Sequence, residues 1–137
     1  MKTQLTGHSL ISGISIQETG TPFRAVNPAN DQELEPQYDQ LAKASVDAVA
    51  VQAQKAFKEY SLRSGADKAG FLRQIADNIE AVVEDLVERM PAETALPEPR
   101  VRGEAGRTMG QLRLFAGLVE EGSWLDARIE TAQPDRQ

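Results

Sequence analysis

Apolar side chains recur at three- and four-residue spacing through the middle of the chain, a pattern that predicts helices. The clearest run lies between residues 72 and 90, where one face is apolar and the opposite face is charged. Its apolar members are Leu72, Ile75, Ala76, Ile79, Val82, Val83, Leu86, Val87 and Met90. Because proline lacks a backbone N–H, Pro91 is expected to stop or kink this helix near Arg89.

A first helix is predicted before this run. Ser45 is the expected N-cap, and Asp47 lies in the first turn, where the helix dipole favours a carboxylate. The Ser64-Gly65 pair separates this helix from the next. Its apolar face comprises Val46, Val49, Ala53, Ala56, Phe57 and Tyr60.

A third helix is predicted over residues 100–121, after a Leu96-Pro97-Glu98-Pro99 connection and before Gly122 as the terminating residue. Its apolar face comprises Val101, Ala105, Thr108, Leu112, Phe115, Ala116 and Val119. Gly103, Gly106 and Gly110 share a stripe on this helix, although each costs about 0.8–1.0 kcal/mol relative to alanine. We interpret the stripe as a site of close backbone packing. A phosphate-binding loop would need G-x-G-x-x-G after a strand.

Strand signals flank the helical part. Residues 10–16 carry β-branched side chains around a glycine, and residues 23–26 form a second short strand that Asn27-Pro28 ends. Turn residues at 19–22 and 29–31 complete the prediction of two short hairpins. After Gly122, apolar and polar residues alternate from Leu125 through Ala127, Ile129 and Thr131, which predicts one more strand. Trp124 is the expected packing anchor between the third helix and this strand.

The predicted fold is therefore α+β, with two N-terminal β-hairpins, three helices and one C-terminal strand. The expected organisation is hairpins over 1–38, a helical segment over 39–122, and a strand with a polar tail over 123–137. A length of 137 residues suits one domain. Only 5% of the residues are aromatic, so large side chains for a core are scarce and we expect apolar faces that something else covers.

Charge narrows the classes of partner. The chain has 15 basic and 21 acidic residues and a net charge of −6, which argues against nucleic acid and against anionic membranes. No apolar run approaches the ~18 residues of a membrane span, and a cytoplasmic location is expected. The absence of cysteine excludes disulfides, thiolate metal sites and cysteine nucleophiles.

Candidate chemistry is sparse. His8 is the only histidine, so a two-histidine metal site or a His-based triad cannot be built, and we interpret it as a turn or surface residue. The acidic residues Glu80, Glu84 and Glu88 recur on one polar face and predict a solvated surface. The third-helix arginines are interpreted as helix-start and surface charge; they are Arg100, Arg102 and Arg107. No catalytic, cofactor-binding or metal residue is predicted from these patterns.

Several segments carry a family resemblance. They are Val26-Asn27-Pro28-Ala29, the run from Gly70 to Glu80, Glu88-Arg89 with Glu93-Thr94-Ala95-Leu96-Pro97-Glu98, Gly103-Glu104 with Gly106-Arg107-Thr108, the run from Gly110 to Ala116, and Gly122-Ser123-Trp124-Leu125. Together they resemble the N-terminal segment of the aldehyde dehydrogenase superfamily, closest to the branch that oxidises α-ketoglutaric semialdehyde (2,5-dioxovalerate). The similarity covers nearly the whole chain.

The resemblance implies a parent enzyme with an α/β fold that oxidises an aldehyde through a cysteine thiohemiacetal and passes hydride to NAD or NADP. The catalytic asparagine, glutamate and cysteine, and the cofactor loop, would follow Gln137 in the family's order. We therefore expect a truncated dehydrogenase that binds no cofactor and is inactive alone. Its expected partner is the remainder of the fold in a homo-oligomeric parent. A subunit of a split dehydrogenase and a stand-alone helical interaction module are the alternatives.

A monovalent cation site is a weaker implication of the resemblance. Some relatives place such an ion near the backbone that precedes the Asn-Pro turn and near an acidic residue, here Ala25, Val26 and Glu93. We favour Glu93 as a plain surface or capping carboxylate. Pro91 departs from the family pattern, because relatives usually continue a helix through this position.

Overall fold

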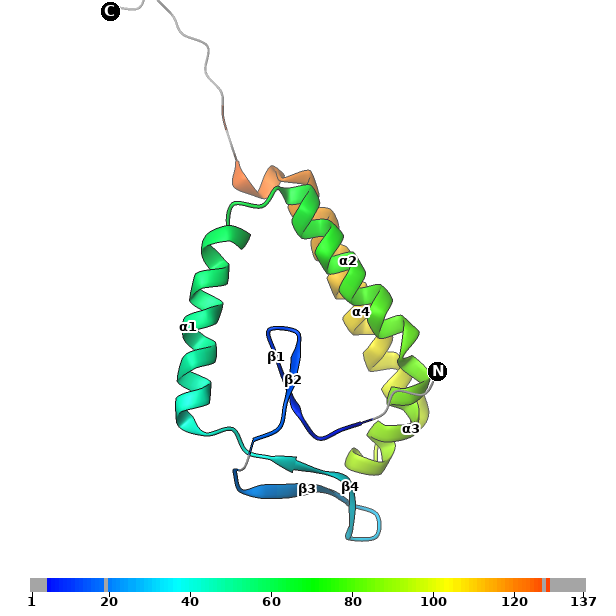
Figure 1. Cartoon of the computed structure of the whole chain (residues 1–137). Coiled ribbons are helices and arrows are strands. Elements are labelled where there is room, and N and C mark those ends of the chain that lie inside the picture. The colour runs from blue at the N-terminus through cyan, green and yellow to red at the C-terminus, as the bar shows by residue number, and fades with distance from the viewer. Residues whose placement is uncertain (1–4, 19, 127, 129–137) are drawn as a thin grey trace, which may run out of the picture.

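Two β-hairpins and four α-helices make up the part of the chain that the computed structural model describes, residues 5–18, 20–126 and 128 (Figure 1). The strands are β1 (Ser9–Ile11), β2 (Ile14–Ile16), β3 (Pro22–Asn27) and β4 (Gln32–Asp39). The helices are α1 (Lys43–Tyr60), α2 (Gly65–Ala81), α3 (Val83–Thr94) and α4 (Glu98–Glu121), and a 3₁₀ turn, η1 (Ser123–Leu125), follows them. The mixed α/β character is as predicted, but the number of helices is not.

The two predicted hairpins are present, with a different division of the first one. Residues 10–16 are not one strand but fold back on themselves, so that β1 pairs antiparallel with β2. The reason is the Ser12-Gly13 turn, in which both residues have positive φ (52° and 77°). Such a two-residue turn matches the twist of a tight hairpin. The second hairpin pairs β3 with β4, and the Asp31 N–H donates to the Asn27 carbonyl oxygen at 2.8 Å across its turn.

The first helix begins at Lys43, and the predicted N-cap was wrong. Ala42 takes that position and gives no side-chain cap. The Ser45 hydroxyl instead donates to the Glu18 carboxylate at 2.5 Å, and the Ala42 N–H donates to the same carboxylate at 3.3 Å. A partner 27 residues away, invisible to a local cap rule, therefore fixes the start of α1.

The predicted second helix is two helices, and its break is not at the proline. Val82, with φ −114° and ψ 11°, leaves the helical path, and its N–H bonds to the Ile79 carbonyl at 3.1 Å in a tighter turn. Pro91 lies inside α3, which continues to Thr94. Because Pro91 falls near the end of α3, its missing N–H removes one hydrogen bond without stopping the last turn.

Both ends of α4 also refine the prediction. The helix begins two residues early because Pro99 lies in the first turn, where a missing N–H has no partner to lose. Gly122 ends it in the left-handed region at φ 78°, as predicted. Leu125 lies in η1 rather than in a strand, while Ala127, Ile129 and Thr131 of the predicted strand lie outside the described residues. Trp124 in η1 is 58% exposed, so the expected packing anchor is not found there.

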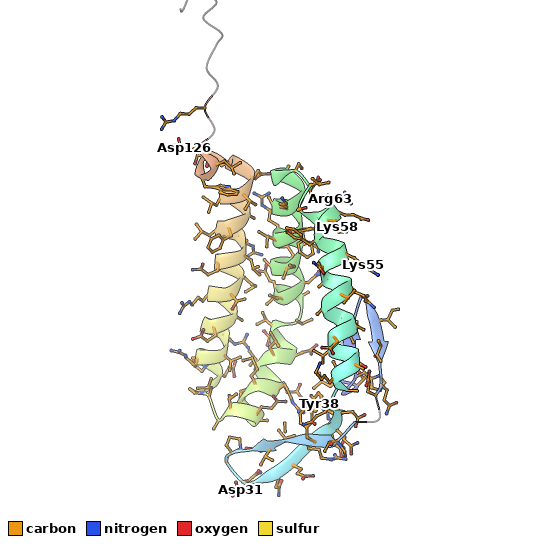
Figure 2. All side chains as sticks on the ribbon, turned by 90° about the vertical axis from the view of Figure 1, so that its left-hand side faces the viewer. Asp31, Tyr38, Lys55, Lys58, Arg63 and Asp126 are labelled. Atoms are coloured by element: carbon orange, nitrogen blue, oxygen red, sulfur yellow. The ribbon has the colours of Figure 1, made fainter. Side chains whose placement is uncertain are left out.

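The core of the described region is the seam between α2 and α4, which run side by side in Figures 1 and 2. The fully buried hydrophobic residues of that region all belong to it: Ala69, Ala76, Val101 and Ala116. The helices approach closely because these side chains are small. At the upper end, a Cβ on Gly65 would overlap the Val119 carbonyl oxygen, so this glycine is required by the packing.

The other elements pack loosely around this seam. The α1 helix stands apart from the α2–α4 pair, with the β1–β2 hairpin between them, and none of its residues is buried (Figure 1). Lys55, Lys58 and Arg63 project from α1 and the following turn on the side facing the viewer in Figure 2. An edge-to-face contact between the rings of Tyr60 and Phe71, 5.9 Å apart, connects its end to α2. Among the described helices, none is long and apolar enough to cross a membrane.

Candidate functional site

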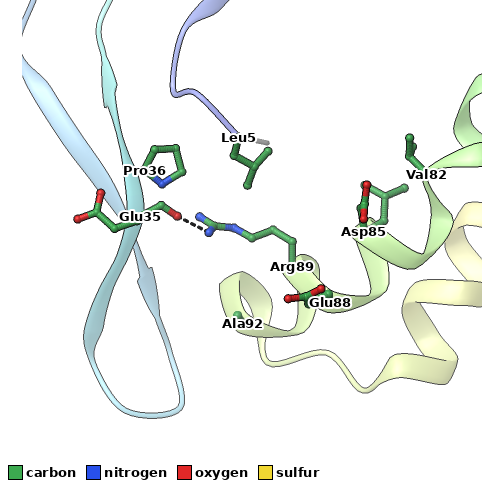
Figure 3. Close-up of a pocket in the computed structure, with 9 residues that line it drawn as sticks. Leu5, Glu35, Pro36, Val82, Asp85, Glu88, Arg89 and Ala92 are labelled. Atoms are coloured by element: carbon green, nitrogen blue, oxygen red, sulfur yellow. Dashed lines mark hydrogen bonds between the residues drawn. The ribbon is translucent and has the colours of Figure 1, made fainter. Parts of the chain in front are cut away.

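A pocket of about 540 Å³ lies between the N-terminal stretch, β4 and α3 (Figure 3). Its lining is Leu5, Glu35, Pro36, Val82, Asp85, Leu86, Glu88, Arg89 and Ala92. The volume falls within the usual range of ligand pockets, roughly 300–1,000 Å³. The lining contains carboxylates and a guanidinium but no hydroxyl, imidazole or amine, so it offers no nucleophile with an adjacent base.

Arg89 is the central polar side chain of this pocket and connects α3 to β4. Its Nη1 donates to the backbone oxygen of Glu35 (Figure 3), and its Nε donates to Glu93 Oε1 at 2.5 Å. The side chain is 23% exposed, and its buried Nη2 has no hydrogen-bond partner among the described residues. Nη1 therefore joins α3 to a residue 54 positions earlier in β4, while Nε bonds within α3, and both contacts are structural. No spacing signal in the sequence pointed to this connection.

The residues of the implied cation site are held by other contacts. Glu93 forms an i,i+4 ion pair with Arg89. Ala25 and Val26 stand opposite Leu34 and Glu33 in the β3–β4 hairpin. Because the positive Arg89 guanidinium already lies against the Glu93 carboxylate, it disfavours the binding of a second cation at that carboxylate. Among the described residues there is no group of three or more acidic or histidine side chains that could hold a metal ion. The cation site stays an implication of the resemblance, and the pairing of Glu93 supports the plainer interpretation.

The acidic face predicted to be solvated has partners across the helix seam. Glu80 and Asp77 accept hydrogen bonds from Arg113 at 2.6 and 3.0 Å, and Glu84 accepts from Arg102 at 2.7 Å. These groups remain largely exposed, as expected for surface charge. The hydrogen bonds that Arg102 donates to Glu84 and Glu98 raise the pKa of Arg102, and the bond to Glu84 lowers the pKa of that carboxyl group. A further ion pair joins Arg73 of α2 to Glu120 of α4 at 2.5 Å. The hydrogen bond from Arg73 lowers the pKa of Glu120.

The remaining predicted positions lie at the surface and do not converge. His8 is exposed, and its Nδ1 lies 3.0 Å from the Ser15 hydroxyl within the first hairpin. Arg100 pairs with Glu104 one turn along α4. These positions lie on separate elements from the pocket at Arg89, so no catalytic constellation assembles within the described residues.

What dominates the described surface is uncovered apolar area. The whole chain exposes 10844 Å². A compact monomer of 15.0 kDa would expose about 7,000 Å². With an allowance of about 2,400 Å² for the residues outside the described ranges, an excess of about 1,400 Å² of accessible surface remains. The exposed large side chains include Leu10, Ile14, Phe23, Val46, Val51, Phe57, Leu62, Phe71, Leu114, Phe115, Leu118, Trp124 and Leu125.

The sequence profile of the aldehyde dehydrogenase family matches residues 15–135, most of the chain. The chain belongs to the aldehyde dehydrogenase family. Alpha-ketoglutaric semialdehyde dehydrogenase 2 of Azospirillum brasilense is 42% identical over 134 residues, covering 97% of this chain and 26% of that relative. Alpha-ketoglutaric semialdehyde dehydrogenase of Acinetobacter baylyi is 36% identical over 131 residues, covering 96% and 25% respectively. This aldehyde dehydrogenase chain thus spans about a quarter of the length of the curated relatives it matches.

Solved structures agree on the fold. A betaine aldehyde dehydrogenase from Staphylococcus aureus, determined in complex with NAD+, superposes with a TM-score of 0.81 at 19% identity. The match covers 96% of this chain and 27% of that one. An NAD-dependent benzaldehyde dehydrogenase from Corynebacterium glutamicum gives a TM-score of 0.65, also at 19% identity, over 98% of this chain and 29% of that one. The hairpins and helices described here are therefore an arrangement that aldehyde dehydrogenases share.

Proposed function

We propose that this chain is the N-terminal scaffold of an NAD(P)-dependent aldehyde dehydrogenase that oxidises α-ketoglutaric semialdehyde, or a similar aldehyde, to the carboxylate. The names of its two relatives support the substrate, and the NAD+ in the Staphylococcus aureus neighbour supports the cofactor. In this proposal the 137 residues provide no catalytic or cofactor-binding group and are inactive alone. The remainder of the fold, in a homo-oligomeric enzyme, is the partner.

The observation that carries the proposal is the uncovered apolar surface. Large apolar side chains are exposed in the described region, and an excess of about 1,400 Å² of accessible surface exceeds the ~800 Å² that one partner buries in a standard protein–protein interface. A stand-alone interaction module would leave that surface in water between encounters, a liability for a monomer. A chain that makes up a quarter of its relatives' length instead has a natural cover in the other three quarters. Whether that cover is continuous with the chain or a separate subunit does not alter its chemistry.

A graft tests the proposal. The matched segment of the Azospirillum brasilense enzyme is replaced by these 137 residues, and the purified graft is assayed for NAD(P) reduction with α-ketoglutaric semialdehyde. We expect turnover by the graft and none by the chain alone. The matched control is the same enzyme with the segment deleted, which we expect to be inactive. A soluble graft that fails to oxidise the semialdehyde, or turnover by the isolated chain, would contradict the proposal.

A further inference from the structure

Helix α4 presents three different sides along its length. One side packs against α2 through its buried residues, including Val101 and Ala116. The adjoining side carries Arg102, which pairs with Glu84, and Arg113, which pairs with Asp77. At 3.6 residues per turn, the positions opposite α2 fall on a single stripe. We call this stripe the outer face of α4; it consists of Gly103, Gly106, Gly110, Leu114 and Gly117.

No other described element approaches the glycines of the outer face. A Cβ placed on any of the four would meet no atom of the described residues within 4 Å, apart from its own stretch of helix. Leu114 on the same face is 63% exposed, and Phe115 and Leu118 beside it are 50% and 43% exposed. The close packing that the sequence predicted for Gly103, Gly106 and Gly110 is therefore not satisfied within the described part of the chain. These glycines differ from Gly65, which does have a backbone against it.

We infer that the outer face of α4 is the surface onto which the remaining three quarters of the dehydrogenase fold docks, with a backbone segment lying along the glycines and apolar side chains covering Leu114. This inference rests on the proposed function and names the contact face. The occupant follows from the length of the relatives, of which this chain covers 26%, and from the large apolar side chains that the described region leaves exposed. The five positions of the face carry no charge; Arg107 borders it on one side, and on the other lie Arg102, which pairs with Glu84 of α3, and Arg113, which pairs with Asp77 of α2. Small residues in such a row allow close backbone approach, and apolar residues beside them supply the area to bury.

Cysteine footprinting tests the inference, because the chain has no cysteine of its own. Leu114→Cys and, as the control, Leu62→Cys are each placed in the Azospirillum brasilense graft and in the isolated chain. Leu62 is 86% exposed in the turn between α1 and α2, away from the outer face. Maleimide labelling is followed peptide by peptide, so that cysteines of the grafted enzyme do not interfere. In the isolated chain we expect both residues to label quickly.

In the graft we expect labelling at Leu114→Cys to slow by at least tenfold while Leu62→Cys labels as before. Equal labelling of the two in an active graft would overturn the inference and leave the proposed function standing. An inactive unsubstituted graft is the separate failure of the proposed function. A second copy of the chain is the other possible occupant, and sedimentation of the isolated chain tests for it. If self-association protects Leu114→Cys as strongly as the graft does, a second copy is the occupant and our assignment is wrong.

Discussion

Replacing Gly65 by alanine measures how closely α2 and α4 are packed. The new methyl group would overlap the Val119 carbonyl oxygen and lie 3.3 Å from its carbon. Both partners are helix backbone, so no side chain can rotate away, and the two helices must separate at this end. Overpacking of this kind costs about 1–3 kcal/mol. Alanine recovers at most about 1 kcal/mol of helix propensity, so we expect a net loss of about 1–2 kcal/mol in the free energy of unfolding.

The control lies five residues along the same helix. A Cβ on Gly70 would meet nothing within 4 Å, so Gly70→Ala should stabilise the chain by about 0.5–1 kcal/mol. Urea unfolding followed by far-UV circular dichroism compares the two variants with the parent chain. The same glycine-to-alanine change should therefore lower the urea midpoint at Gly65 and raise it at Gly70. It is refuted if Gly65→Ala unfolds at the same or a higher urea concentration than the parent, because the helices would then not be in backbone contact.

Three further outcomes follow from individual contacts. Ser64→Ala removes the side-chain cap of α2, in which the serine oxygen accepts the Asp67 N–H at 3.0 Å, and should cost about 1 kcal/mol by the same urea assay. Hydrogen bonds from arginine hold the pKa values of Glu84 and Glu120 below their ordinary 4.5, so the stability they provide is complete above that pH and is lost as the pH falls through their lower folded values. The Glu84→Gln/Glu120→Gln double variant should therefore flatten the decline of the urea midpoint below pH 4.5, and an unchanged decline would exclude these carboxyls as its cause. Glu18→Ala should speed amide hydrogen exchange in the first turn of α1 but not in α2; unaltered exchange there would show that Glu18 does not hold the start of α1.

The sequence was informative where structure depends on neighbours along the chain. The periodicity between residues 72 and 90 located helical structure correctly, and Gly122 ended α4 as expected. Both signals depend on residues that are close together in the sequence. It failed where a distant partner decides. Glu18 determines the start of α1 from another element, and the break at Val82 rather than Pro91 has no local sequence signature. Expectations from local rules are weakest at these long-range junctions.

The functional part of the prediction depended on resemblance, for a physical reason. Catalysis needs convergent groups, and the patterns of charge and spacing in this sequence predicted none. Arg89 illustrates the limit: its contacts with Glu35 and Glu93 are visible only once α3 lies against β4. The family segments, in contrast, lie along nearly the whole chain and can be recognised although it covers only about a quarter of its relatives.

The glycines of α4 affect both the stability of the free chain and its assembly with the rest of the enzyme. Gly103, Gly106, Gly110 and Gly117 lower helix propensity, and a Cβ on each would meet none of the residues that the structure describes, so each could be replaced by alanine with a gain of up to about 1 kcal/mol. A sequence shaped for stability as a free chain would have little reason to retain four of them on one face. Retention is explained if another backbone lies where their side chains would be. The property that makes this chain marginal alone is then the one that suits it to assembly, and substitutions that stabilise the free chain on this face should weaken the complete enzyme.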